Sequence, residues 1–179
     1  MTYGGWLRAC FVACLIGLDG AAPASAQSTF AGVVTRVSDG DTVWVRPDGA
    51  QRKPVKLRLR GIDAPERCQH GGAAATSALS ALVLAQRVEV TGRAHDRYGR
   101  LVGDMHRERD GLDTGAWMVY HGHAWSGRFH GRPVLYAREE NRARAARRGL
   151  FADADAVAPA QFRKRHGPCE GVRRTWRSR

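Results

Sequence analysis

Several features common in other protein classes are missing from this sequence of 179 residues. It has no internal repeat, no long low-complexity linker and no group of histidines and cysteines with the spacing of a zinc site. Its apolar run at residues 9–18 is too short to span a bilayer, which takes about 20 residues. These absences argue against a repeat protein, a zinc-binding module and a membrane-spanning protein. The length favours one domain with accessory segments.

Acidic residues are scarce relative to basic ones. The chain has 17 Asp and Glu against 29 Lys and Arg, which gives a formal net charge of +12 at pH 7. Such an excess attracts polyanions through long-range electrostatics and counterion release, and nucleic acid is a natural partner. Charge alone leaves two alternatives open: a basic protein that is merely soluble, and one that adheres to acidic envelope surfaces or glycans.

The N-terminal segment has the pattern of a secretory signal peptide. Arg8 supplies a positive n-region, residues 9–18 form the apolar stretch, and Ala24-Ser25-Ala26 is a small-residue cleavage pattern. We therefore expect residues 1–26 to be removed, with the mature chain beginning near Gln27 and the protein secreted or periplasmic.

Cysteine is sparse, and signal cleavage reduces it further. Removal of residues 1–26 takes away Cys10 and Cys14 and leaves Cys68 and Cys169. Two cysteines in an exported chain are most simply explained by one disulfide, with two free thiols or an intermolecular pair as alternatives. Such a bridge would hold the basic C-terminal segment beside the acidic turn described below. An earlier cleavage with lipid attached to Cys14 is a further alternative for the N-terminus.

Hydrophobic periodicity predicts a small barrel. Strands are expected over residues 31–37, 42–46, 55–60, 87–91 and 101–106, and helices over residues 72–84, 113–120 and 133–148. This pattern fits an α+β fold with a five-stranded OB-fold-like β-barrel and three helices. We place that domain at residues 27–151 and expect residues 152–179 to be an irregular basic extension.

Carboxylates gather at turns next to strands. Asp41 lies in a tight turn in which Gly40 is free to take a positive φ, Asp63 lies at a strand end, and Glu66 follows one short turn later. Hard oxygen ligands suit Ca²⁺ or Mg²⁺, with carbonyls and waters completing the shell. A carboxylate beside a metal can take a proton from an attacking water. The alternatives are ordinary turn-forming aspartates and a surface glutamate.

Arginines are available to bind phosphate beside these carboxylates. The strand Val55–Arg60 alternates apolar and basic side chains, so it buries one face and presents guanidinium groups from the other. A second basic turn, Asp96–Arg100, offers Arg100. Planar guanidinium groups bind phosphodiester oxygens bidentately. Alternation alone does not separate Arg58 from Arg60 as the functional residue.

Three segments resemble the signature segments of the staphylococcal nuclease (thermonuclease) family. They are Ser38–Thr42, Arg58–Glu66 and Asp96–Arg100, and the similarity extends over about residues 30–151, ending with Arg147–Phe151. Each segment is moderately specific alone, and all three in order are highly specific. The segment between Cys68 and Gly72 departs from the best-known member, which has a longer lysine-rich loop there.

The resemblance implies a metal site that binds Ca²⁺. Asp41 and Asp63 match the family's calcium-binding carboxylates. Ala64 stands where the family usually has a threonine that gives its backbone carbonyl to the metal, and alanine retains that carbonyl.

The resemblance also implies the catalytic residues. Glu66 matches the general base, Arg58 and Arg100 match the phosphate-binding arginines, and Tyr98 matches a tyrosine at the edge of the nucleotide pocket. Family members hydrolyse DNA and RNA with little sequence preference and leave 3′-phosphates. We expect a monomeric Ca²⁺-dependent nuclease without stable membrane insertion. A non-catalytic nucleic-acid-binding barrel, for DNA uptake or envelope adhesion, is the alternative.

Overall fold

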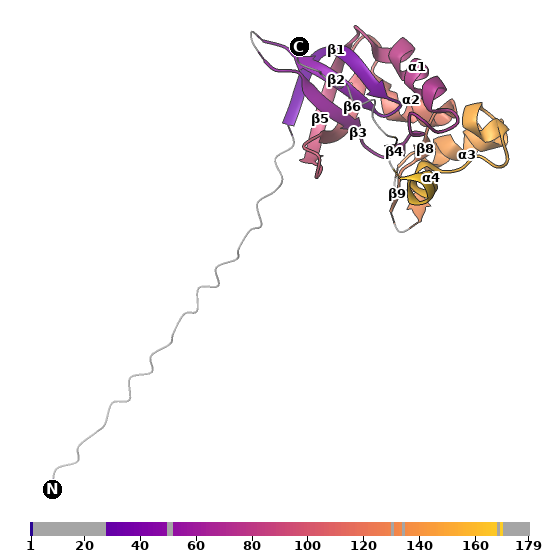
Figure 1. Ribbon diagram of the computed structural model, residues 1–179. Coiled ribbons are helices and arrows are strands. Elements are labelled where there is room, and N and C mark those ends of the chain that lie inside the picture. Colours follow the sequence, from indigo (N-terminus) through magenta and orange to yellow (C-terminus); the bar gives the residue numbers. More distant parts are fainter. Residues whose placement is uncertain (2–27, 50–51, 130, 134, 168, 170–179) are drawn as a thin grey trace, which may run out of the picture.

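The computed structural model describes residues 1, 28–49, 52–129, 131–133, 135–167 and 169 (Figure 1). The predicted signal peptide and the lipidation alternative at Cys14 lie outside the described residues. Within the described part of the chain, no helix combines the length and apolar character needed to cross a bilayer.

Five strands form the predicted barrel, and the α+β fold is confirmed. They are β1 (Ser28–Asp39), β2 (Thr42–Pro47), β3 (Val55–Leu59), β5 (Arg87–His95) and β6 (Leu101–Arg107). The strand order is β3-β2-β1-β5-β6, continued by the short β7 (Leu112–Asp113). A parallel pairing of β3 with β6 closes the sheet, with Leu57 opposite Leu101. Closure leaves the main strands without open edges.

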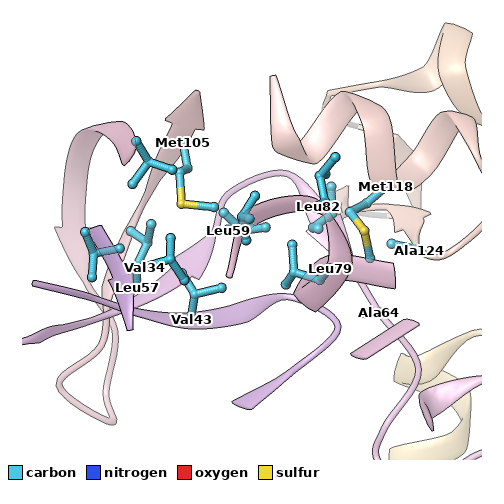
Figure 2. Close-up of a cluster of buried hydrophobic side chains, with 14 of the residues drawn as sticks. Val34, Val43, Leu57, Leu59, Ala64, Leu79, Leu82, Met105, Met118 and Ala124 are labelled. Atoms are coloured by element: carbon cyan, nitrogen blue, oxygen red, sulfur yellow. The ribbon is translucent and has the colours of Figure 1, made fainter. Parts of the chain in front are cut away.

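Apolar side chains of the strands and of helix α1 (Gly72–Val83) form one core cluster. Figure 2 shows Leu79 and Leu82 of α1 next to Val43 and Leu59. Leu79 is fully buried and Leu82 is 7% exposed, so the helix predicted over residues 72–84 packs on the core through its leucines. The alternation in β3 is confirmed as well, because Leu57 and Leu59 are buried in this core.

Helices α2 (Thr114–Tyr120) and α3 (Ala137–Ala145) complete the predicted set, but α3 begins later than expected. Pro133 belongs instead to β10 (Arg132–Pro133), which pairs with β9 (Arg128–Phe129). The residue before α3, Tyr136, has a left-handed backbone with φ of 56°, and its hydroxyl donates to Asp113 Oδ2 at 3.0 Å. This tertiary contact fixes where α3 begins.

The expectation of an irregular segment after residue 151 is wrong for residues 159–166, and residues 168 and 170–179 lie outside the described part of the chain. The 3₁₀ turn Gly149–Ala152 leads to a fourth helix, α4 (Pro159–His166). Proline at its first turn and Gly167 after its end, with φ of 73°, are typical helix boundaries. In Figure 1, α4 lies beside β4 (Ile62–Asp63), β8 (Trp125–Ser126) and β9.

Contacts on several sides fix the C-terminal segment to the domain. Cys68 and Cys169 form a disulfide with their Cα atoms 5.7 Å apart. The Gln69 side chain donates from Nε2 to the carbonyl of Val157 at 2.6 Å. A second apolar cluster lies under the segment and contains Trp125, Ala143 and Phe151, against which Leu150, Ala156 and Ala158 pack.

Candidate active site

A cavity of about 490 Å³ opens between the barrel strands, the turn after β4 and helix α4. Its lining residues are Asp39, Asp41, Lys56, Arg58, Ala64, Pro65, Glu66, Arg97, Tyr98, Arg100 and Arg163. Of the seven site residues predicted from the sequence, six line this cavity. The seventh, Asp63, joins the same cluster through Arg58, as described below. The structure therefore brings the whole predicted set together, while the roles of its members stay predictions.

The turn between β1 and β2 positions Asp41. Its backbone N–H donates to Asp39 Oδ1 at 3.1 Å, and its Oδ1 accepts from the Thr42 hydroxyl at 3.0 Å. Gly40 does not take the positive φ that is open to glycine. Glycine is needed there because a Cβ atom would lie only 2.7 Å from the Cβ atoms of Ala64 and Ala75. The turn can thus approach the acidic segment closely.

Strand pairing places Arg58 between the two aspartates. Arg58 lies opposite Thr42 in the β2–β3 pair. Its Nη1 is 2.7 Å from Asp41 Oδ2, and its Nη2 is 3.4 Å from Asp63 Oδ1. The Ala64 N–H also donates to Asp41 Oδ2, at 3.1 Å. One guanidinium therefore joins both predicted metal ligands.

Arg60, which alternation could not separate from Arg58, has a different environment. Its Nε donates to Asp104 Oδ1 of β6 at 2.8 Å, and it does not line the cavity. The two arginines therefore differ in their partners: Arg58 contacts Asp41 and Asp63, whereas Arg60 contacts Asp104.

A third arginine, which the sequence analysis missed, contacts the acidic segment. Nη1 of Arg163 on α4 is 2.8 Å from Glu66 Oε1, and Nη2 is 3.1 Å from Asp63 Oδ2. These contacts raise the pKa of Arg163, although burial acts in the opposite direction. The disulfide predicted between Cys68 and Cys169 was the signal that could have pointed to a basic residue here.

The opposite wall of the cavity is the turn Asp96–Arg100. Asp96 Oδ1 accepts from the backbone N–H groups of Tyr98 and Arg100 at 2.8 and 3.0 Å. Its Oδ2 lies 2.6 Å from Arg100 Nε, which orients this guanidinium. The Tyr98 side chain is an exposed aromatic surface at the rim, 70% accessible, with the Arg100 guanidinium 5.4 Å from its ring centre. Base stacking is a natural use for such a ring.

Burial and mutual repulsion affect the acidic groups. Burial, followed by repulsion from Asp41, raises the pKa of Asp39 to about 6. Burial also raises the pKa of Asp63, although hydrogen bonding and attraction from Arg163, and attraction from Arg58, oppose it. Several carboxylates therefore lie close together where little water reaches them. A bound cation would reduce the repulsion between them. Asp39, like Lys56 and Arg97, is a lining residue that the sequence analysis did not select.

The donor chemistry fits a hard divalent cation. Asp41 and Asp63 present carboxylate oxygens on either side of one guanidinium, and the Ala64 peptide adjoins them. In the described part of the chain, no three His, Cys, Asp or Glu side chains form a metal-holding group by themselves. The remaining ligands of a cation would therefore be a backbone carbonyl, waters or phosphate oxygens.

A closed OB-like barrel whose basic cavity combines carboxylates with arginines from separate walls defines a nucleic-acid-processing protein. Comparison with known proteins makes this specific. The family model "Staphylococcal nuclease homologue" matches residues 56–153. The chain belongs to this family.

Curated relatives agree with that assignment. An uncharacterized endonuclease of Escherichia coli O157:H7 is 42% identical over 135 residues, covering 75% of this chain and 85% of that protein. Protein ParB of Escherichia coli is 39% identical over 153 residues, covering 80% and 84%. Micrococcal nuclease of Shigella flexneri is 36% identical over 149 residues, covering 78% and 83%. The protein is a nuclease, a hydrolase that acts on nucleic acids.

Proposed function

We propose that this nuclease is Ca²⁺-dependent and hydrolyses phosphodiester bonds of DNA and RNA with little sequence specificity. The observation that carries the proposal is that Asp41, Asp63 and Glu66 adjoin one cavity together with Arg58 and Arg100. Binding alone would require the arginines but not three carboxylates. This separates the proposal from a non-catalytic nucleic-acid-binding barrel.

In this mechanism Glu66 accepts a proton from the water that attacks phosphorus. Its side chain is 26% exposed and lines the cavity, so water reaches it. General-base assistance of this kind requires a hydrogen bond of about 2.6–3.2 Å between carboxylate and water. In-line attack would then displace the leaving oxygen on the opposite side of the phosphate.

Arg58 and Arg100 hold the phosphate during the attack. They approach from different walls, one from β3 and one from the Asp96–Arg100 turn. Charge grows on the non-bridging oxygens in the transition state, so fixed guanidinium groups stabilise it more than the ground state. The ion pair with Asp96 keeps Arg100 in place before substrate binds.

Asp41, Asp63 and the backbone carbonyl of Ala64 are the groups that would hold Ca²⁺. A bound divalent cation supplies Lewis-acid stabilisation of the charge that develops on the phosphate oxygens. The two carboxylates now contact Arg58 and Arg163. Coordination would therefore exchange guanidinium contacts for metal contacts at the same oxygens.

We also infer an exported, monomeric enzyme. The signal-peptide pattern of residues 1–26 supports secretion or a periplasmic location, and a disulfide suits an oxidising compartment. One chain supplies every lining residue of the cavity, so the proposed chemistry does not require a second copy.

Digestion of plasmid DNA and of single-stranded RNA by the mature protein tests the proposal. Both should be degraded with Ca²⁺ and left intact with a chelator, and added Ca²⁺ should restore cleavage. Glu89→Gln, a change at an exposed glutamate of β5, serves as the matched control for Glu66→Gln. Cleavage that continues in chelator would remove the metal from the mechanism. Equal activity of the two variants would remove Glu66.

A further inference from the structure

Helix α4 separates the active-site cavity from a second cavity of about 290 Å³. The second cavity is lined by Arg58, Ile62, Asp63, Trp125, Ser126, Gly127, Arg128, Ala158, Pro159, Ala160 and Arg163. Arg58 and Arg163 line both cavities, so they form the boundary between them. A strand that passes through the active site would meet this boundary.

Arg163 lies where a phosphate close to the reacting one would be. The attacking water must be within a hydrogen bond of Glu66 and about 3–3.5 Å from phosphorus, so the reacting phosphate is within about 6 Å of that carboxylate. Arg163 Nη1 is 2.8 Å from Glu66 Oε1. Its side chain is 41% exposed, so an incoming anion can reach the guanidinium while it contacts Asp63 and Glu66.

The second cavity has the composition of a nucleoside pocket. Trp125 and Pro159 provide apolar surface, while Arg128 adds a further guanidinium at the wall. Its volume is just below the range of about 300–1,000 Å³ found for ligand pockets. A lining that combines apolar residues with several charged groups suits a nucleobase and sugar with phosphate attached.

The backbone of this boundary is held firmly. The disulfide fixes the chain after α4, the Gln69–Val157 hydrogen bond fixes the chain before it, and Ala158 packs on the Trp125 cluster. A guanidinium on a fixed backbone loses less entropy when it binds a phosphate than one on a free tail.

We propose that Arg163 is a substrate-binding residue, which holds the phosphate next to the scissile one while the second cavity receives the attached nucleoside. This inference rests on the proposed nuclease function. It assigns helix α4 to the substrate-binding surface and predicts that substrates with a charged neighbouring phosphate are preferred.

The test combines a protein change with a substrate change. Cleavage at the central linkage of a short DNA oligonucleotide is followed by chromatography in Ca²⁺. The linkage on either side is replaced, one at a time, by an uncharged methylphosphonate. For one of these positions the wild type should lose about tenfold in kcat/KM, as expected for a lost charge-assisted contact. Arg163→Ala should have a kcat/KM about tenfold below that of the wild type on the normal oligonucleotide. The methylphosphonate at that position should not lower the kcat/KM of this variant further.

Arg165→Ala is the matched control, because Arg165 is on the same helix and lines neither cavity. It should respond to the methylphosphonates as the wild type does. Thermal denaturation checks that each variant is folded. Equal methylphosphonate penalties in wild type and Arg163→Ala at both positions would overturn the proposal.

Calorimetric titration with Ca²⁺ tests the proposed role of Arg163 in a second way. Tighter Ca²⁺ binding together with faster cleavage by Arg163→Ala would make Arg163 a competitor of the cation and not a substrate contact. If the wild type leaves the unmodified oligonucleotide intact, the proposed function itself fails, whatever the variants do.

Discussion

Two clusters of carboxylates and arginines differ in how they are enclosed: a closed cluster around Glu140 and an open cluster that contains Asp63 and Glu66. In α3, the Glu140 side chain is 4% exposed and accepts from the Ser126 N–H at 2.9 Å. It also binds Arg128 Nη2 at 2.7 Å and Arg144 Nε at 2.8 Å. In the cavity, Asp63 and Glu66 are 18% and 26% exposed and bind arginine side chains at their outer edge.

The same chemical groups therefore serve different purposes. The partners of Glu140 include a backbone N–H and leave no room for another ligand, so that cluster fixes α3 against β8 and β9. The contacts of Asp63 and Glu66 face a cavity, where water, a cation or a phosphate can replace a guanidinium. Ion pairing alone does not identify a functional site, because Glu140 is paired with arginines as closely as Asp63 and Glu66 are.

The largest expected effect separates activity from stability at the open cluster. Glu66→Gln should lower kcat by about 10²–10⁴-fold, because the amide cannot accept the proton from water. The free energy of unfolding should change by less than about 1 kcal/mol, since the ion pair with Arg163 is partly exposed. Steady-state kinetics and urea denaturation measure the two. A large loss of stability would show that Glu66, like Glu140, mainly holds the fold together.

The reverse result is expected at the closed cluster. Glu140→Gln removes the charge that two arginines and a buried N–H share, which should cost about 2–3 kcal/mol. Thermal denaturation should show a Tm lower by roughly 5–10 °C. Most of the activity should survive well below that temperature. Loss of activity without loss of stability would contradict the structural role.

Gly40→Ala should lower both activity and stability, because Gly40 lies between Asp41 of the active site and Ala75 of the core. The added methyl group would collide with Ala64 and Ala75, and such overpacking costs about 1–3 kcal/mol. It would also move Asp41 away from Ala64, so cleavage should fall as well. Denaturation and kinetics on the same sample test this. A fully stable, fully active variant would show that the close approach is unnecessary.

The smallest effect is expected for an ion pair that belongs to neither cluster. Arg60→Ala should change stability by less than about 1 kcal/mol, because the pair is partly exposed and Asp104 keeps Arg93 as a partner. Cleavage should stay at the wild-type rate. Arg58→Ala, in contrast, should abolish most cleavage. Comparing the cleavage rates of the two variants tests whether Arg58 and Arg60 have different roles.

Most of the barrel could be found from the sequence because its signals are local, and the site residues could be predicted because three segments resemble the family's signature segments. Alternation marks β3, and the spacing of Asp63 and Glu66 fits within one turn. The start of α3 could not be found, since it depends on the hydroxyl of Tyr136 reaching Asp113. Nor could Arg163, which is separated from Glu66 by 97 positions in the chain.

Helix α4 was missed for a different reason. Its eight residues have little amphipathic character, and its last turn is entirely basic, from Arg163 to His166. Propensity cannot sustain so short a helix alone. Packing on the Trp125 cluster and the disulfide hold it, and both depend on residues distant in the chain. Proline at the start and glycine after the end were the local signals available.

The disulfide also imposes an order on biosynthesis. Cys169 follows Cys68 by 101 residues, and every barrel strand precedes Cys169. A nascent chain can therefore form its barrel before the two thiols are both present and oxidised. Until that oxidation, no disulfide cross-link holds α4 and Arg163 next to the cavity. The cross-link that fixes α4 beside Asp63 and Glu66 therefore depends on an oxidising compartment and forms only after the barrel strands have been synthesised.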